Sequence, residues 1–131
     1  MRTAALAFLF LLFVATTSAA DDFMLPPGDA VRGQEAFVAL RCYACHRVQG
    51  ATLPAPVATP PVPITLGAAP SSWTDAGLVT SIIAPSHAIA RPEYGENVAT
   101  GGLSRMGDFT SVMTVRQLVD LVAFLRKHER R

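Results

Sequence analysis

The stretch Cys42-Tyr43-Ala44-Cys45-His46 carries most of the information in this chain. Two thiols separated by two residues can each add to one vinyl group along the same edge of a porphyrin, and the imidazole that follows can then bind the iron. A change of one residue in this spacing would move a thiol away from its vinyl group or the imidazole away from the iron. Cys42 and Cys45 are also the only two cysteines of the chain. The motif therefore predicts one covalent haem c, with Cys42 and Cys45 forming the thioether bonds and His46 binding the iron.

Two other uses of these residues fit the sequence less well. A zinc site would need a fourth ligand and usually a second pair of ligands. A redox-active dithiol of the thioredoxin type would need alternating strands and helices around it, and no such pattern surrounds Cys42. The pattern favours haem over both.

The first twenty residues have the pattern of a secretory signal peptide. Residues 4–15 form an unbroken apolar run after Arg2, and residues 16–20 are the small residues at which signal peptidase cuts. The run is shorter than the ~20 residues of a membrane-spanning helix. We expect residues 1–20 to be cleaved after about Ala20 and the mature protein to be periplasmic, with an uncleaved N-terminal anchor as the alternative. A lead-in, residues 21–27, would then precede one domain, residues 28–131.

The mature chain is long enough for one small domain with a single core. The whole sequence has 11 Lys and Arg against 10 Asp and Glu, and removal of Arg2 with the signal peptide would balance the two. Because nucleic-acid binding usually requires a basic face, this composition argues against a nucleic-acid partner. The C-terminal residues 126–131 are mostly basic, and we expect their side chains, including that of His128, to be solvated.

Three segments have the pattern of short helices, and no segment has the pattern of a β-strand. Asp29 is a suitable N-cap for the first helix, and Gly33 within that helix predicts a close helix crossing that Phe37 fills one turn later. Thr114 and Gln117 have the spacing of a capping box at the start of the last helix. The predicted helices cover residues 30–40, 73–84 and 114–125.

The segments between these helices have the composition of loops. Residues 51–70 hold six prolines together with several apolar residues, which predicts an extended loop that wraps over a hydrophobic surface. Residues 86–110 are rich in glycine and are also expected to form a loop.

In order and spacing, these features resemble a small, soluble bacterial class I cytochrome c over residues 28–125. The similarity begins with the glycine- and phenylalanine-bearing helix from Gly28 to Phe37, continues through the Cys-x-x-Cys-His motif, and ends with Met106-Gly107-Asp108-Phe109 before the last helix. The resemblance implies an all-α cytochrome c fold, with three to four short helices and a proline-rich loop around one covalently bound haem. It also implies that the first and last helices cross through Gly33, Phe37 and Phe124.

The same resemblance implies that Met106 is the second axial ligand of the iron, opposite His46. Met113 and His87 are the alternatives. Met113 directly precedes the cap of the last helix, where an apolar side chain commonly packs back on the helix.

Two features depart from the family pattern. Gly107 stands where a proline usually follows the ligand methionine, which would loosen the loop. Both Pro61 and Pro63 fit the proline whose carbonyl accepts a hydrogen bond from the proximal imidazole, and the sequence does not choose between them.

We therefore expect an electron-transfer protein and not an enzyme, because two axial ligands leave no open position on the iron. Its partners would be redox proteins, such as a dehydrogenase as donor and an oxidase or reductase as acceptor. One alternative is a haem enzyme or gas-binding sensor in which the sixth ligand is labile. Another is a cytochrome c subunit of a membrane oxidoreductase, which would reach the membrane only through an uncleaved N-terminal segment.

Overall fold

The computed structural model describes residues 23–56, 64–68, 73–89 and 98–129. The predicted signal peptide lies outside these ranges, and so do Pro61 and Pro63. In chain order the elements are helix α1 Ala30–Ala39, 3-10 helix η1 Cys42–Ala44, strands β1 His46–Val48 and β2 Ile64–Leu66, helix α2 Asp75–Ile83, strands β3 Ala99–Thr100 and β4 Leu103–Ser104, and helix α3 Val115–Lys127.

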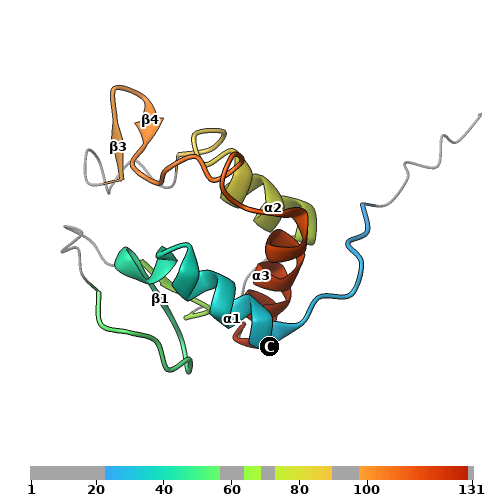
Figure 1. Cartoon of the computed structure of the whole chain (residues 1–131). Coiled ribbons are helices and arrows are strands. Elements are labelled where there is room, and N and C mark those ends of the chain that lie inside the picture. Colours follow the sequence, from blue (N-terminus) through green and yellow to red (C-terminus); the bar gives the residue numbers. More distant parts are fainter. Residues whose placement is uncertain (1–22, 57–63, 69–72, 90–97, 130–131) are drawn as a thin grey trace, which may run out of the picture.

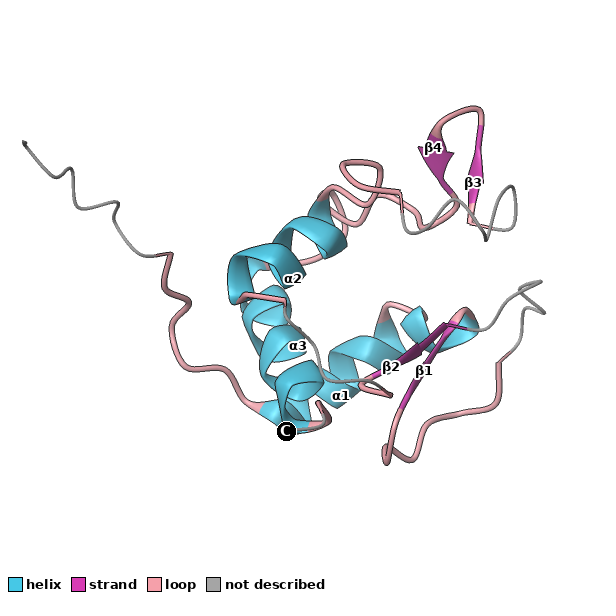
Figure 2. Cartoon of the chain, turned by 180° about the vertical axis from the view of Figure 1, so that it is seen from behind, coloured by secondary structure: helices cyan, strands magenta, loops and turns pink. Residues whose placement is uncertain are grey.

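The ribbon has the shape of a C. Helix α3 forms its back, α1 with η1 and β1 extends along one arm, and α2 with the β3–β4 hairpin extends along the other (Figure 1). The view from behind shows the same two arms with the opening on the opposite side (Figure 2). Within the described ranges, none of the helices is long and apolar enough to cross a membrane.

The fold is mostly helical, as predicted, and it also contains two short sheets, although the sequence predicted no strand. Strands β1 and β2 pair in parallel, with His46 opposite Ile64 and Val48 opposite Leu66. Strands β3 and β4 form an antiparallel hairpin. Strands of two or three residues are too short to show an alternating pattern, and a parallel pair joins segments distant in the sequence, so neither sheet had a local signal.

Helix α1 begins at the N-cap that the sequence predicts and ends at its C-cap, Leu40. The carboxylate of Asp29 accepts hydrogen bonds from the backbone N–H groups of Val31 at 2.8 Å and Arg32 at 3.1 Å, which satisfies donors that the first helical turn leaves open. The last residues lead through Leu40 to Arg41, whose φ of 58° is in the left-handed region. This turn starts η1 directly after α1.

Helices α1 and α3 cross at Gly33, as the sequence predicted. A side chain at Gly33 would collide with the backbone carbonyl of Asp120 and with Phe124, so only glycine permits this approach. Phe37 and the fully buried Phe124 meet edge to face beside the crossing, with ring centroids 5.5 Å apart. The two aromatic rings form the centre of the core.

A buried carboxylate joins the same two helices. Asp120 on α3 is 2% exposed and accepts a hydrogen bond from the backbone N–H of Asp29 at 2.7 Å. The guanidinium of Arg32 donates to it through Nε at 2.9 Å and through Nη2 at 3.3 Å. The hydrogen bond from Arg32, followed by the one from the Asp29 backbone, lowers the pKa of Asp120 below its ordinary value.

Helix α2 is shorter than predicted and is weakly buried. Thr74 caps it by accepting a hydrogen bond from the N–H of Gly77 at 3.1 Å. The helix ends at Ile83, before Ala84 and Pro85, and none of its residues is buried. Its apolar side chains therefore stay partly exposed in the protein chain alone.

Helix α3 begins with the predicted capping box. Thr114 Oγ1 accepts from the N–H of Gln117 at 3.1 Å, and the backbone N–H of Thr114 donates to Gln117 Oε1 at 2.9 Å. Met113 packs against the core cluster, and its N–H donates to the carbonyl of Phe109 at 2.9 Å. This matches the packing interpretation of Met113.

The end of α3 differs from the expected solvated terminus. His128 is only partly exposed, and its ring packs edge to face against Phe124 with centroids 5.0 Å apart. Arg126 donates hydrogen bonds to Asp75 at 2.8 Å and Glu129 at 2.6 Å. Polar composition made this segment look solvated, whereas its position beside β1 and α2 buries part of it.

We predict that Gly33→Ala destabilises the protein. A helical alanine gains about 1 kcal/mol over glycine in propensity, but overpacking typically costs about 1–3 kcal/mol, occasionally more. Here the added carbon meets a backbone carbonyl, which can yield only if the helices separate. Urea unfolding of the holoprotein measures the change. Gly107→Ala is the control because a side chain there would meet nothing within 4 Å, and an equal effect of both variants would contradict the crossing argument.

We predict that the Asp120 bridge stabilises the protein above pH 4 and loses this effect in acid. Its pKa is lowered in the folded state from the ordinary 3.8, so its contribution is present above the unfolded-state pKa and disappears as pH falls through the folded-state pKa. The unfolding free energies of the wild type and Asp120→Asn should therefore differ at pH 6 and converge toward pH 2. A difference that stays constant over this range would contradict the assignment.

Candidate functional site

The five-residue motif lies where α1 passes into β1. The N–H of Ala44 donates to the carbonyl of Arg41 at 2.9 Å, and the N–H of Cys45 donates to the carbonyl of Cys42 at 3.2 Å. These bonds close one tight turn with a cysteine at each end. His46 follows at once as the first residue of β1. The local fold therefore keeps both thiols and the imidazole within one short turn.

Both thiols are free in the structure. Cys42 is partly buried and Cys45 is exposed, and no disulfide joins them. Burial raises the pKa of the Cys42 thiol to about 11. Reactive dithiols instead have an attacking cysteine whose pKa is lowered, so this environment is unlike that of a redox-active dithiol. In the ranges that the structure describes, no group of three or more His, Cys, Asp or Glu side chains could hold a metal ion.

His46 is partly exposed as a residue, but its Nδ1 atom is buried. A small hollow of about 60 Å³ lies beside it, lined by His46, Arg47, Val48, Ala51, Leu53 and Pro54. The pairing of His46 with Ile64 fixes the backbone of the imidazole-bearing residue. The two candidate proline acceptors, Pro61 and Pro63, lie outside the described residues, so the choice between them stays a prediction.

Met106 lies on the other arm, two residues after the end of β4. It is partly buried, and its backbone N–H donates to Ser104 Oγ at 3.1 Å. The N–H of Ser104 in turn donates to Ser86 Oγ at 3.0 Å, which ties the hairpin to the turn after α2. The structure therefore brings Cys42, Cys45 and His46 together in one turn and places Met106 on the arm that faces it.

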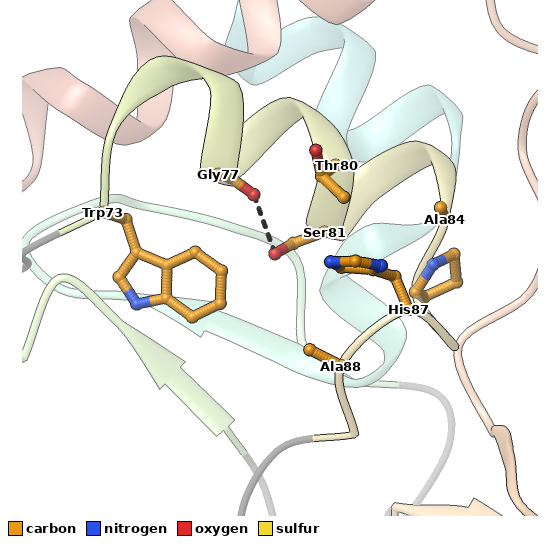
Figure 3. A pocket seen from close by; sticks show the side chains of 8 residues that line it. Trp73, Gly77, Thr80, Ser81, Ala84, His87 and Ala88 are labelled. Atoms are coloured by element: carbon orange, nitrogen blue, oxygen red, sulfur yellow. Dashed lines mark hydrogen bonds between the residues drawn. The ribbon is translucent and has the colours of Figure 1, made fainter.

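A pocket of about 230 Å³ lies along α2 and was not predicted from the sequence. Trp73 and His87 stand at its two ends, with the helical surface between them (Figure 3). That surface is flat because Gly77, Ser81 and Ala84 have small side chains, and Ser81 Oγ donates back to the carbonyl of Gly77 at 2.9 Å. Gly77, Ser81 and Ala84 are spaced four and three residues apart, which places them on one helical face. This spacing of small residues was a usable sequence signal for the pocket. The full lining is Trp73, Gly77, Thr80, Ser81, Ala84, Pro85, His87 and Ala88.

The residues present fit a covalently bound haem. Two free thiols and an imidazole have the required order, and an apolar helix with no buried residue faces them from the other arm. Large apolar side chains are also exposed on that arm, with Trp73 at 51% and Leu103 at 65% exposed. An apolar group bound between the arms would cover surface that the protein alone leaves exposed to water.

A mostly helical domain with a free Cys-x-x-Cys-His turn and unburied apolar surface opposite it has the features of a c-type haem protein. The family model for Cytochrome c matches residues 30–129. The chain therefore belongs to the cytochrome c family, whose members carry covalently bound c-type haem, function in haem-based electron transfer and are generally electron carriers. Comparisons with curated proteins and with solved structures gave no match.

We predict that the haem-free chain does not unfold cooperatively. Helix α2 has no buried residue without the haem, and helices of this length are marginal without tertiary packing. Calorimetry of the holoprotein should show a sharp transition. The double variant Cys42→Ala/Cys45→Ala, produced without haem, should show a broad transition or none. A sharp transition at nearly the holoprotein's temperature would contradict this prediction.

Proposed function

We propose that this protein is a monohaem electron carrier in which Cys42 and Cys45 bind the haem covalently and His46 and Met106 are the axial ligands. The observation that carries the proposal is the single tight turn that presents two free thiols and places His46 at the start of β1. The haem supplies the one-electron change between ferric and ferrous iron. The protein's part is to hold the ligands, exclude water and leave an edge accessible to partners.

The chain's own contacts support the role of His46. An axial imidazole needs its second nitrogen bonded and its ring orientation fixed. The Nδ1 atom of His46 is buried, and the β1–β2 pairing fixes the backbone from which the ring extends. An imidazole with one buried nitrogen on a fixed backbone suits a ligand that keeps one position in both oxidation states.

Met106 is proposed as the second ligand in preference to Met113. Met113 directly precedes the N-cap Thr114 and packs against the core cluster, which accounts for its side chain. Met106 follows the β3–β4 hairpin on the opposite arm and is not among the described residues that pack against this cluster. A neutral thioether would favour ferrous iron and raise the potential relative to a second imidazole. His87, at the end of the α2 pocket, is the remaining alternative.

A haem enzyme or gas-binding sensor is the second candidate function, and one observation favours it. A side chain at Gly107 would meet no atom within 4 Å, so the residue after Met106 is not held by packing on that side. A loosely held loop would allow the sulfur to leave the iron and open a coordination position. The first candidate requires that the sulfur stay bound.

The proposed setting is the periplasm, after cleavage of residues 1–20, with redox proteins as donor and acceptor. Because the numbers of acidic and basic residues are nearly equal, the composition does not favour a highly charged partner such as nucleic acid. Arg126 is engaged with Asp75 and Glu129, so this residue is not available to steer a partner. An uncleaved N-terminal segment would instead make the protein a subunit held at a membrane, and mass spectrometry of the mature N-terminus distinguishes the two.

Visible spectra of the holoprotein test the function directly. An electron carrier with stable His/Met ligation should show the long-wavelength sulfur-to-iron band when oxidised and no spectral change when the reduced protein meets carbon monoxide. Loss of that band together with immediate carbon monoxide binding would instead support the enzyme or sensor.

We predict that Met106→Ala removes the sulfur-to-iron band, opens the iron to carbon monoxide and lowers the midpoint potential. Met113→Ala should keep the band and mainly lower the free energy of unfolding. Truncation of a core methionine typically costs about 2–5 kcal/mol. The same spectra, with urea unfolding, measure both. Loss of the band only in Met113→Ala would make Met113 the ligand, and retention of a closed low-spin iron in both variants would point to His87.

A further inference from the structure

His128 contacts three different parts of the fold from the end of α3. Its backbone N–H closes the helix by donating to the carbonyl of Leu125 at 3.1 Å. Its ring packs against Phe124, at an interplanar angle of 68°. Its Nδ1 atom lies 2.9 Å from the carbonyl oxygen of Gln49. Because a carbonyl oxygen only accepts, Nδ1 carries the hydrogen and donates it.

The second strand of the same sheet also rests on His128. Gly67 follows β2 directly with a φ of 76°, and a side chain there would collide with the backbone carbonyl of His128. The N–H of Gln49 donates to the carbonyl of Leu66, the last residue of β2, at 2.9 Å, which extends the β1–β2 ladder one residue past β1. The end of the sheet is thus joined to His128 from β1 through a hydrogen bond and from β2 through close backbone contact.

This end of the sheet is three residues from the imidazole of His46. A two-stranded sheet of this size is marginal without contacts to other elements, so its position depends on what holds it against the helices. The buried Val48, the last residue of β1, packs into the core, and His128 holds the next residue, Gln49. A shift at Gln49 would pass along so short a strand to His46 at its start.

We propose that His128 is a positioning residue that sets the orientation of the His46 ring by holding strand β1 against α3. The inference rests on the proposed role of His46 as an axial ligand. Groups that orient a metal-binding histidine without touching the metal influence the metal's properties. Here the orienting group is His128 at the C-terminal end of α3, and it acts on His46 through the backbone of β1 and its pairing with β2.

Two substitutions separate the hydrogen bond from the ring contact. His128→Phe keeps an aromatic ring for Phe124 and removes the donor to Gln49. His128→Asn removes the ring and keeps an N–H donor at a similar distance from the backbone. Thr114→Ala is the control, because it weakens α3 at its opposite end by removing the N-cap and touches neither strand.

The holoproteins are compared by midpoint potential, by the paramagnetically shifted proton signals of the haem methyl groups and the His46 ring, and by melting temperature. His128→Phe should move the shifted signals and change the reduction equilibrium constant at least twofold, which is about 18 mV for one electron. His128→Asn should keep the shifted signals and the midpoint potential close to their wild-type values while it melts at a lower temperature. Thr114→Ala should melt at a lower temperature with its midpoint potential and shifted signals unchanged.

The proposal is overturned if His128→Phe melts lower but leaves the potential and the shifted signals at wild-type values, as the control does. If His128→Phe does not yield folded holoprotein, Gly67→Ala replaces it, since a side chain there pushes β2 away from the same residue, and the same signals should move. The wild-type spectrum keeps the two proposals distinct. Absence of shifted His46 ring signals in the wild type refutes the ligand assignment before any His128 variant is measured.

Discussion

The close contact between Gly33 and the backbone of Asp120 determines how the first and last helices of this structure are placed. It lets α1 and α3 approach so closely that Phe37 and Phe124 meet edge to face beside the crossing. The Asp120 carboxylate uses the same approach to accept from the Asp29 backbone and from Arg32. Because α1 ends directly before the Cys-x-x-Cys-His turn, fixing α1 against α3 also fixes where the haem-binding turn begins.

The arm that contains α2 is attached to the C-terminal end of α3. Arg126 donates to the side chain of Asp75 at 2.8 Å and to the carbonyl of Trp73 at 2.6 Å, so it joins the start of α2 to the last helix. The apolar residues of α2 remain unburied. A covalent haem held between the arms, as proposed, would give those residues an apolar partner and complete the core of so small a domain.

The two ends of α3 therefore have different tasks. Its N-terminal part is capped by its own residues, and its middle contributes Asp120 and Phe124 to the crossing. Its C-terminal end holds α2 through Arg126 and the β1–β2 sheet through His128. One helix thus places both the arm that carries His46 and the arm that carries Met106.

Several features of this protein depend only on neighbouring residues, and these could be predicted from the sequence. The Asp29 cap, the Thr114 capping box, the helix-crossing glycine and the haem-binding motif each depend on spacings of a few residues, and each was predicted from those spacings. Other features depend on segments distant in the chain. His46 pairs with Ile64 in the parallel sheet, and His128 contacts Gln49, 79 residues earlier in the chain. The three residues of β1 carry too few side chains to specify a partner strand, and the polar end of α3 has no local sign of the surface it covers. Local geometry was fixed by covalent spacing, whereas these contacts were decided by packing.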